Sequence, residues 1–252
     1  MPVDIAAGKR PTPAITQVMS TGRHAHSILV DPSNRFVFVP NLGVDQVMQM
    51  KFDEKTGIMT SNDPAIITTK ADWGPRHFTF SPNNKFVYLL TELTGMVNGY
   101  ALDSRTGQLV EIQSISAVPR NSKLPPGKIG APLGGPQAKP AAAKKIEEIK
   151  AADIHMTPDG KFLYASERTT GTLAAFSVDG FTGKLTYINS YDTEKQVRGF
   201  NIDPRGNFLL SAGQITEHVS VHKINRETGE LQQLNRISVG KNPNWIEIVE
   251  FP

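Results

Sequence analysis

The sequence predicts an all-β fold, a stretch of β-propeller made of repeated four-stranded blades, because two markers recur in step along the chain. The first marker is a proline-led turn followed by a β-branched and aromatic strand, as in DPSNRFVFVPN (31–41), SPNNKFVYLLTE (81–92), TPDGKFLYASER (157–168) and DPRGNFLLSAGQ (203–214). The second is a polar turn closed by glycine, as in FDEKTG (52–57), LDSRTG (102–107), VDGFTG (178–183) and INRETG (224–229). Both markers are spaced by 50, 76 and 46 residues, and a period near the shorter values is typical of propeller blades.

Each repeat consists of short strands, not helices. Its apolar residues alternate or run continuously over short stretches, whereas a helix would place them at every third or fourth position. We therefore expect four full blades in a single propeller domain spanning residues 1–252. Partial strands are expected at both ends, ITQVMS from residue 15 and NPNWIEIVEF at 242–251, the latter as the innermost strand of a further blade. Such a set gives an incomplete ring, unless the ends pair with each other or with another chain.

The long middle spacing reflects an inserted segment at residues 119–150, which is rich in proline, glycine, alanine and lysine. This composition predicts a surface loop between blades, with a short helix near Ala141–Lys150. A tolerated insertion is favoured over a lid for the channel mouth. Residues 118–150 contain seven basic and two acidic side chains, so the net charge of +3 belongs to this loop. The charge therefore does not indicate a nucleic-acid partner.

Composition and missing motifs exclude several classes of function. The chain has no cysteine, which excludes disulfides, thiolate zinc sites and a cysteine nucleophile. It has no apolar run of membrane-helix length and no secretory apolar core, so we expect a cytoplasmic protein without a membrane partner. Neither a GxSxG elbow nor a phosphate-binding glycine loop is present. Two histidine pairs, His24 with His26 and His218 with His222, lack a third ligand nearby, so no metal site and no cofactor are expected.

Blade geometry brings a set of polar and charged residues to one mouth of the channel. The start of the first strand and the end of the second lie on the same face of a blade, because its strands run alternately up and down. The strand starts carry His24, His26, Arg76, His77, Asp153, His155 and Arg198, and the strand ends carry Asn41, Glu92, Arg168 and Gln214. Any one of these is as well explained by a structural role. Three arginines on one rim nevertheless favour an anionic ligand, since buried like charges are costly unless neutralised and arginine matches phosphate or carboxylate.

Five segments carry a resemblance to a known family. They are HSILVDPSNRFVFVP, GPRHFTFSPNNKFVYLLTEL, AADIHMTPDGKFLYASERT, RGFNIDPRGNFLLSAGQ and VGKNPNWIEI. In order and spacing they resemble the propeller-type 6-phosphogluconolactonases over nearly the whole chain, except the first dozen residues and 119–150. The resemblance implies a seven-bladed lactonase propeller, of which this chain lacks the length for about two blades. It also implies hydrolysis of 6-phospho-D-glucono-1,5-lactone to 6-phosphogluconate, in the pentose phosphate pathway, without a cofactor.

The resemblance also implies roles for the rim residues. The family includes fungal carboxymuconate-lactonising enzymes, whose important His, Arg, Glu and Arg correspond to His26, Arg76, Glu92 and Arg168 here. In the implied hydrolysis, Glu92 or His26 is the general base and Arg76 stabilises the oxyanion. The expected substrate-binding residues are Arg198, Asp153, His155, His77 and Gln214. A carboxymuconate cyclase-like reaction and a non-catalytic interaction platform are the alternatives.

Overall fold

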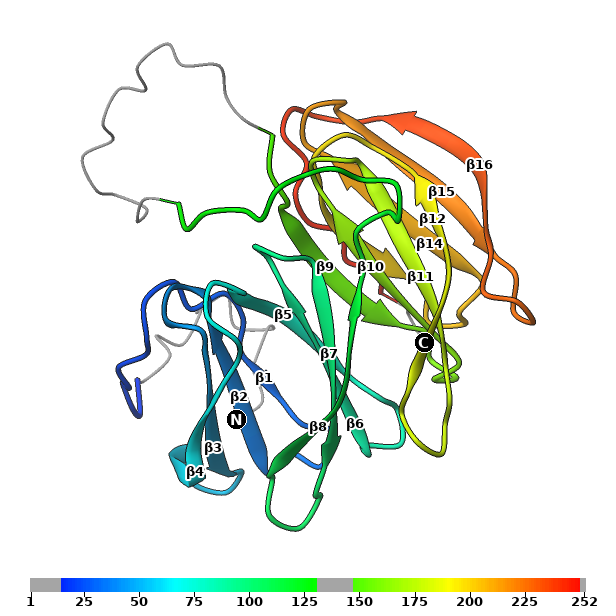
Figure 1. The fold of residues 1–252 in the computed structure, drawn as a ribbon. Coiled ribbons are helices and arrows are strands. Elements are labelled where there is room, and N and C mark those ends of the chain that lie inside the picture. Colours follow the sequence, from blue (N-terminus) through cyan, green and yellow to red (C-terminus); the bar gives the residue numbers. More distant parts are fainter. Residues whose placement is uncertain (1–14, 131–146, 250–252) are drawn as a thin grey trace, which may run out of the picture.

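The four sequence repeats form four separate antiparallel sheets. The computed structural model describes residues 15–130 and 147–249. Within those residues, sixteen strands are arranged in four four-stranded sheets, and one short 3-10 helix covers Leu42–Val44. Figure 1 shows the sheets side by side in chain order, from blue to red. The predicted all-β propeller with four full blades is confirmed, and we number the blades one to four along the chain.

Strands that follow one another along the chain are hydrogen-bonded neighbours within each blade. Blade one contains β1 (Leu29–Val30), β2 (Phe36–Asn41), β3 (Gln46–Asp53) and β4 (Ile58–Thr68), and blade two contains β5 (Pro75–Phe80), β6 (Phe86–Thr91), β7 (Met96–Leu102) and β8 (Leu109–Ser116). Blade three contains β9 (Ala151–Met156), β10 (Phe162–Glu167), β11 (Thr172–Val178) and β12 (Leu185–Asp192), and blade four contains β13 (Val197–Ile202), β14 (Phe208–Gly213), β15 (His218–Ile224) and β16 (Leu231–Ser238). The described part of the chain has no helix with the length and apolar character needed to cross a bilayer.

Neighbouring blades pack together at the inner side of the fan, through the second strand of blade one and the first strands of the other blades. Close packing joins β2 with β5, β5 with β9, and β9 with β13. Among the described residues, no strand of blade one packs closely against a strand of blade four. The described blades therefore form an incomplete ring whose inner strands are shared neighbours, which is the arrangement that brings the predicted rim residues near one another.

The residue before each turn proline closes that turn with its side chain. Asp31 Oδ1 accepts hydrogen bonds from the amides of Arg35 and Phe36, at 2.9 and 2.8 Å. The equivalent pairs are Ser81 with Phe86, Thr157 with Phe162 and Asp203 with Phe208. Short side chains with an oxygen acceptor pair readily with nearby backbone amides. This bond explains why Asp, Ser or Thr stands at the start of every repeat.

The two sequence markers of neighbouring blades touch each other across the blade boundaries. Gly107, which closes the polar turn of blade two, has a φ of +72°, and a Cβ there would collide with the Phe36 ring of blade one. The same contact recurs between Gly183 and Phe86 and between Gly229 and Phe162. A side chain at these glycines would meet both a left-handed backbone and a neighbouring ring. These contacts pack each blade against the next, and the spacing of the two markers is equal because they are 25 residues apart within every blade.

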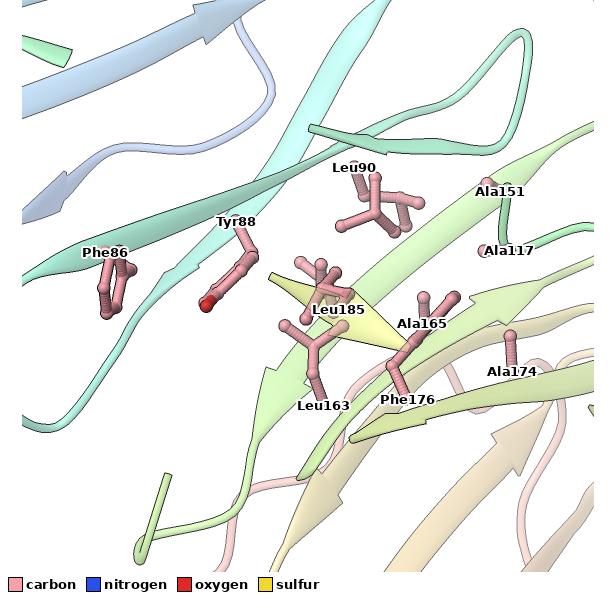
Figure 2. Close-up of a cluster of buried hydrophobic side chains, with 12 residues drawn as sticks. Phe86, Tyr88, Leu90, Ala117, Ala151, Leu163, Ala165, Ala174, Phe176 and Leu185 are labelled. Carbon is pink, nitrogen blue, oxygen red and sulfur yellow. The ribbon is translucent and has the colours of Figure 1, made fainter. Parts of the chain in front are cut away.

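An apolar cluster fills the boundary between blades two and three, as Figure 2 shows. Tyr88 and Leu90 of β6 pack with Leu163 of β10 and Phe176 of β11, and all four side chains are fully buried. The Tyr88 hydroxyl donates to the carbonyl of Gly183 at 2.9 Å, so its polar end is satisfied. Burying each large apolar side chain contributes about 1.5–3 kcal/mol. This packing holds the inner strands from which the rim residues project.

The partial strands expected at the two ends are not formed, and this prediction was wrong. Residues 15–22 and 242–249 belong to no sheet. The Gln17 side chain exchanges hydrogen bonds with the Met59 backbone at 2.8 and 2.9 Å, and Asn201 Nδ2 donates to the Ile246 carbonyl at 3.2 Å. A strand needs a ladder of successive backbone bonds. Side chains attach these segments to the outer blades instead, so no ladder begins.

The inserted segment is described only at its two ends. Residues 131–146 lie outside the described residues, together with most of the helix expected near Ala141–Lys150, and residues 147–150 are not helical. At the described ends, the Gly127 amide donates to the Leu93 carbonyl at 2.7 Å and the Ile149 amide donates to the Pro125 carbonyl at 3.0 Å. Both ends of the insertion therefore meet at the end of β6, beside the predicted rim.

Candidate functional site

β-Bulges at the same point of three innermost strands redirect the predicted site residues. The pairing of β5 with β6 shifts register around Arg76 and His77. Corresponding shifts occur around Asp153 in β9 and Arg198 in β13. A bulge interrupts the alternation of side chains between the faces of a strand. Arg76 and His77, although consecutive, therefore both reach blade three, the first at the Ala152 carbonyl and the second at the Asp153 carboxylate.

Glu92 joins two of the predicted arginines into one cluster. Its Oε2 accepts a hydrogen bond from Nε of Arg76 at 2.8 Å, and its Oε1 lies 2.7 Å from Nη2 of Arg168. Arg76 is only 1% exposed and Arg168 only 7%, so both guanidinium groups are removed from bulk water. Arg76 also donates from Nη1 to the carbonyl of Ala152. The structure thus brings these three predicted residues together across the boundary of blades two and three.

Burial and opposite charges determine the ionisation of this cluster. Burial, opposed by the charge of Glu92 and reinforced by that of Arg168, lowers the pKa of Arg76 to about 10, so Arg76 stays protonated at neutral pH. Burial by itself would raise the pKa of Glu92, but the charges of Arg168 and Arg76 outweigh it and lower that pKa. Glu92 is therefore a carboxylate at neutral pH and a weak proton acceptor.

The cluster contains more positive charge than its carboxylate neutralises. Arg198 is half-buried beside Arg168, and burial together with the Arg168 charge lowers the pKa of Arg198. No residue in the described ranges forms a hydrogen bond or ion pair with the Arg198 guanidinium. Nη2 of Arg168 is buried, and its contact with Glu92 lacks hydrogen-bond geometry. The Arg198 guanidinium, which has no such partner among the described residues, is suited to phosphate or carboxylate oxygens.

His26 approaches the cluster from blade one. Its Nε2 lies 3.9 Å from Oε2 of Glu92, and its Nδ1 lies 3.1 Å from the carbonyl oxygen of His24. Because a carbonyl oxygen only accepts, Nδ1 carries the proton and Nε2 presents a lone pair. Burial and the charge of Arg76 lower the pKa of His26 to about 4, so the ring is neutral at pH 7. The Ser27 hydroxyl donates to the Arg76 carbonyl at 3.0 Å and ties this segment to blade two.

Asp153 is a second buried carboxylate, and it connects blades two, three and four. Its Oδ1 lies 2.8 Å from Nδ1 of His77, and its Oδ2 lies 3.2 Å from Nε2 of His155. The amides of Ile154 and Phe200 donate to the same carboxylate at 3.1 and 3.3 Å. Burial by itself would raise the pKa of Asp153, but His155 and His77 outweigh it and lower that pKa. Three of the predicted substrate-binding residues thus form one hydrogen-bonded group.

Backbone carbonyl groups orient the site arginines, and the sequence reasoning missed them. The Lys150 carbonyl accepts from the amide of Arg168 at 3.1 Å and from its Nε at 2.8 Å. Lys150 is the last residue of the inserted segment, so the end of the insertion helps to aim a site arginine. The Ala152 carbonyl does the same for Arg76. Every residue carries this acceptor, so no residue type could have signalled the role.

Two predicted rim residues do not join the cluster. Gln214 donates from Nε2 to Oδ1 of Asn242 at 2.7 Å, so it holds the C-terminal segment. Asn41 is one position out of register, because it is the last residue of β2 whereas Glu92 follows the last residue of β6. Leu42 takes the position equivalent to Glu92, so blade one presents an apolar side chain there.

The cluster lies outside the large hollows of the surface. Hollows of about 780 and 730 Å³ lie along the outer strands of blades three and four and include none of the predicted site residues. His26 lines a smaller one, of about 320 Å³, with methionines of blade one. Among the described residues, blades one and four do not pack closely against each other, so the inner strands do not line a closed channel. Within the two described ranges, no group of three or more His, Asp or Glu residues is arranged to bind a metal ion.

Comparison with known proteins gives this geometry a family. The family model described as "Lactonase, 7-bladed beta-propeller" matches residues 7–248. A 6-phosphogluconolactonase of Pectobacterium carotovorum is 38% identical over 224 residues, which are 89% of this chain and 60% of that protein.

Solved structures agree with that match. A protein from Lactobacillus plantarum superposes with a TM-score of 0.77 at 25% identity, over 92% of this chain and 63% of that one. The periplasmic gluconolactonase of Pseudomonas aeruginosa superposes with a TM-score of 0.70 at 26% identity, over 86% of this chain and 55% of that one. This chain therefore spans about 60% of the length of the curated relative. Because the family model covers nearly all of its residues, the chain belongs to the seven-bladed β-propeller lactonase family.

Proposed function

We propose that the rim cluster of this chain hydrolyses a phosphorylated sugar lactone, 6-phospho-D-glucono-1,5-lactone, to 6-phosphogluconate. The observation that carries the proposal is the excess of guanidinium groups over carboxylates where Arg76, Glu92, Arg168 and Arg198 meet. Relatives named 6-phosphogluconolactonase, at 35 to 38% identity, support the lactone as the substrate class.

The charge balance favours a phosphorylated lactone over a neutral one. Three guanidinium groups face the Glu92 carboxylate, and the charge of the nearby Asp153 carboxylate also acts on Arg76, so three cations and two anions leave one positive charge. A phosphate monoester carries about −1.5 to −2 charges near neutral pH. Such a group would offset the positive charge of the cluster and accept hydrogen bonds from the Arg198 guanidinium.

Lactone hydrolysis divides into tasks that these residues can perform. Water attacks the lactone carbonyl carbon, and negative charge develops on the carbonyl oxygen. Arg76 is buried and held by both Glu92 and the Ala152 carbonyl, so it is a preorganised donor for that oxygen. One such donor is worth about 2.7–4 kcal/mol. Arg168 and Arg198 bind the phosphate, Glu92 holds two guanidinium groups in place, and His26 lines the substrate side. A general base must take the proton from water.

A direct assay tests the proposal. The full chain is mixed with 6-phosphogluconolactone and with unphosphorylated glucono-1,5-lactone, and the decay of each is corrected for spontaneous hydrolysis. We expect faster turnover of the phosphorylated lactone, with competitive inhibition by inorganic phosphate. Acceleration of neither lactone would overturn the proposal. Equal turnover of both, unaffected by phosphate, would remove the phosphate assignment and leave only the lactone class.

Removing an anion-binding arginine should weaken binding more than turnover. For Arg168→Ala or Arg198→Ala we expect KM to rise about tenfold to hundredfold, because a hydrogen bond to a charged group contributes about 1.5–3 kcal/mol. The preference for the phosphorylated lactone should shrink by the same factor. Arg105→Ala is the matched control, because that arginine is 87% exposed and contacts only its neighbour Asp103. An equal effect of all three substitutions on KM would contradict the assignment.

A further inference from the structure

His77 differs from the other proton acceptors at the rim in the group it contacts. Its Nδ1 lies 2.8 Å from Oδ1 of Asp153, a carboxylate that is 3% exposed as a residue. A carboxylate only accepts hydrogen bonds, so Nδ1 of His77 carries the proton and Nε2 presents its lone pair. No described residue hydrogen-bonds that Nε2, and the His77 side chain is 18% exposed. The lone pair is therefore accessible to a water molecule at the rim.

The bulge in β5 places this lone pair next to the oxyanion donor. Arg76 and His77 are consecutive, and both turn towards β9 of blade three. In a regular strand, two consecutive side chains would point to opposite faces. The bulge thus sets a proton acceptor beside a cationic donor, which are the two groups that attack of water on a carbonyl requires.

The other two candidate bases are less suited to the task. Glu92 is held between Arg76 and Arg168, and their charges lower its pKa. His26 has only the His24 carbonyl on its Nδ1, and burial lowers its pKa to about 4. A base is most effective when its pKa is near the working pH.

The charged groups around His77 act in both directions. Burial and the charge of Arg76 lower the pKa of His77, while the hydrogen bond and charge of Asp153 raise it. His155, on the far side of Asp153, lowers it slightly, and His26 is neutral at pH 7. Asp153 thus opposes the effect of burial on His77 through a contact of 2.8 Å, whereas the carboxylate that acts on His26, Glu92, lies 3.9 Å away and is shared with two arginines.

We infer that His77 is the general base of the proposed hydrolysis and that Asp153 is the positioning residue that keeps Nε2 of His77 free to accept a proton. This inference depends on the proposed function. It assigns to the histidine–aspartate pair the proton transfer that the family resemblance led us to expect from Glu92 or His26.

The resulting step balances without any further reagent. Nε2 of His77 takes a proton from water as the water oxygen bonds to the lactone carbonyl carbon, and the carbonyl electron pair moves to the oxygen beside Arg76. The tetrahedral intermediate then collapses, the bond from carbon to ring oxygen breaks, and the departing ring oxygen takes the proton back from Nε2. The product is the open-chain hydroxy acid, which loses its acidic proton to solvent, and His77 is neutral again.

Kinetics of three variants of the full chain test the assignment. For His77→Gln we expect kcat to fall about 10²- to 10⁴-fold with little change in KM, the range for loss of a general base. The acid limb of the wild-type pH–rate profile, expected below pH 6.5 because the His77 pKa is lowered, should disappear in this variant. In His77→Gly, added imidazole should restore part of kcat. His218→Gln is the matched control, because this histidine lies on β15 and, among the described residues, its ring hydrogen-bonds only with the Thr216 carbonyl in the preceding turn. Its kcat should equal that of the wild type.

Asp153→Asn separates positioning from structural support. An amide can donate to Nδ1 of His77, which moves the ring proton to Nε2 and removes the acceptor. We expect kcat to fall while KM is kept, and the remaining acid limb to move to lower pH, because the carboxylate that raises the His77 pKa is gone. Loss of a structural clamp alone would leave the acid limb in place. If Asp153→Asn does not fold, the kinetics of the His77 variants and the NMR measurement of the His77 ring test the inference without it.

Nuclear magnetic resonance of ¹⁵N-histidine-labelled wild-type chain gives a test without turnover. The His77 signals, assigned by their absence in His77→Gln, should show a protonated Nδ1 and an unprotonated Nε2 at pH 7. A proton on Nε2, or full kcat in His77→Gln, would overturn the inference while leaving the proposed function intact. An inactive wild type that still shows the Nδ1 proton would instead count against the proposed function and, with it, against His77 as its base.

Discussion

Glu92 and Glu194 are both largely buried glutamates paired with arginine, yet only the Glu92 cluster has more positive than negative charge. Glu194 accepts hydrogen bonds from Nε and Nη2 of Arg236, at 2.8 and 3.1 Å, and from the Ser220 hydroxyl at 2.6 Å. Here one cation meets one anion, and the acceptors are filled. Glu92 instead lies between two buried arginines, with a third beside them.

This difference in charge balance is the reason why we propose a structural role for one ion pair and ligand binding for the other. Both carboxylates remain charged, because their arginine partners outweigh burial. At Glu194 nothing is left for a ligand to satisfy. At Glu92 a surplus of positive charge remains, which the proposed anionic ligand would offset, and buried charge without a partner is costly.

The largest effect should come from neutralising the carboxylate of the open cluster. In Glu92→Gln three guanidinium groups lose their anion, and we expect the unfolding free energy to fall by about 3 kcal/mol. This value is at the low end of the range for breaking a buried ion pair, because the Glu92 side chain is 17% exposed. Inorganic phosphate should restore part of that loss, by about 1.4 kcal/mol for each tenfold excess over Kd. Urea unfolding with and without phosphate measures both quantities.

Glu194→Gln is the control for that experiment. It also loses a charged partner, but its arginine can reach solvent, since the Arg236 side chain is 45% exposed. We expect a smaller destabilisation that phosphate does not reverse. If phosphate restored the unfolding free energy of both variants to the same degree, the Glu92 cluster would not differ from the Glu194 pair in anion binding.

The next effect concerns turnover. If the proposed hydrolysis is correct, Arg76→Ala should lower kcat for the phosphorylated lactone by about 10²- to 10³-fold, because it removes the proposed oxyanion donor. Arg236→Ala, the same substitution at the closed pair, should leave kcat within about twofold of the wild type. Steady-state assays at matched folded fractions, checked by circular dichroism, separate the two. Full activity in Arg76→Ala would remove that arginine from the chemistry.

The smallest effect is the acid titration of the closed pair. Burial by itself would raise the pKa of Glu194, but the hydrogen bonds from Arg236 and Ser220 lower it to about 2. A depressed carboxylate pKa stabilises the fold fully above the unfolded pKa of about 4.3, and the contribution is lost as pH falls through about 2. The difference in unfolding free energy between wild type and Glu194→Gln should therefore shrink from pH 5 to pH 2. A difference that stays constant would contradict the lowered pKa.

Much of the site was predictable because it is periodic. His26, Arg76 and Arg198 each stand six positions before a turn proline, and Glu92, Arg168 and Gln214 each stand ten positions after one. Once the repeat was found, equivalent positions had to lie at equivalent places on neighbouring blades. The exceptions, Asn41 and Gln214, arose where the register was one residue out or where the C-terminal segment offered a nearer partner.

The sequence by itself determined the repeat, because turn prolines, oxygen-bearing turn residues and left-handed glycines are local requirements of each hairpin, and their spacing counts the blades. Only the tertiary structure decided which charges meet. The bulges that turn Arg76 and His77 the same way, the carbonyl groups of Lys150 and Ala152, and the two histidines on Asp153 all depend on contacts between blades. The physical reason is that a hydrogen bond between segments far apart in the chain depends on where packing places both partners, and neither partner's residue type records that position.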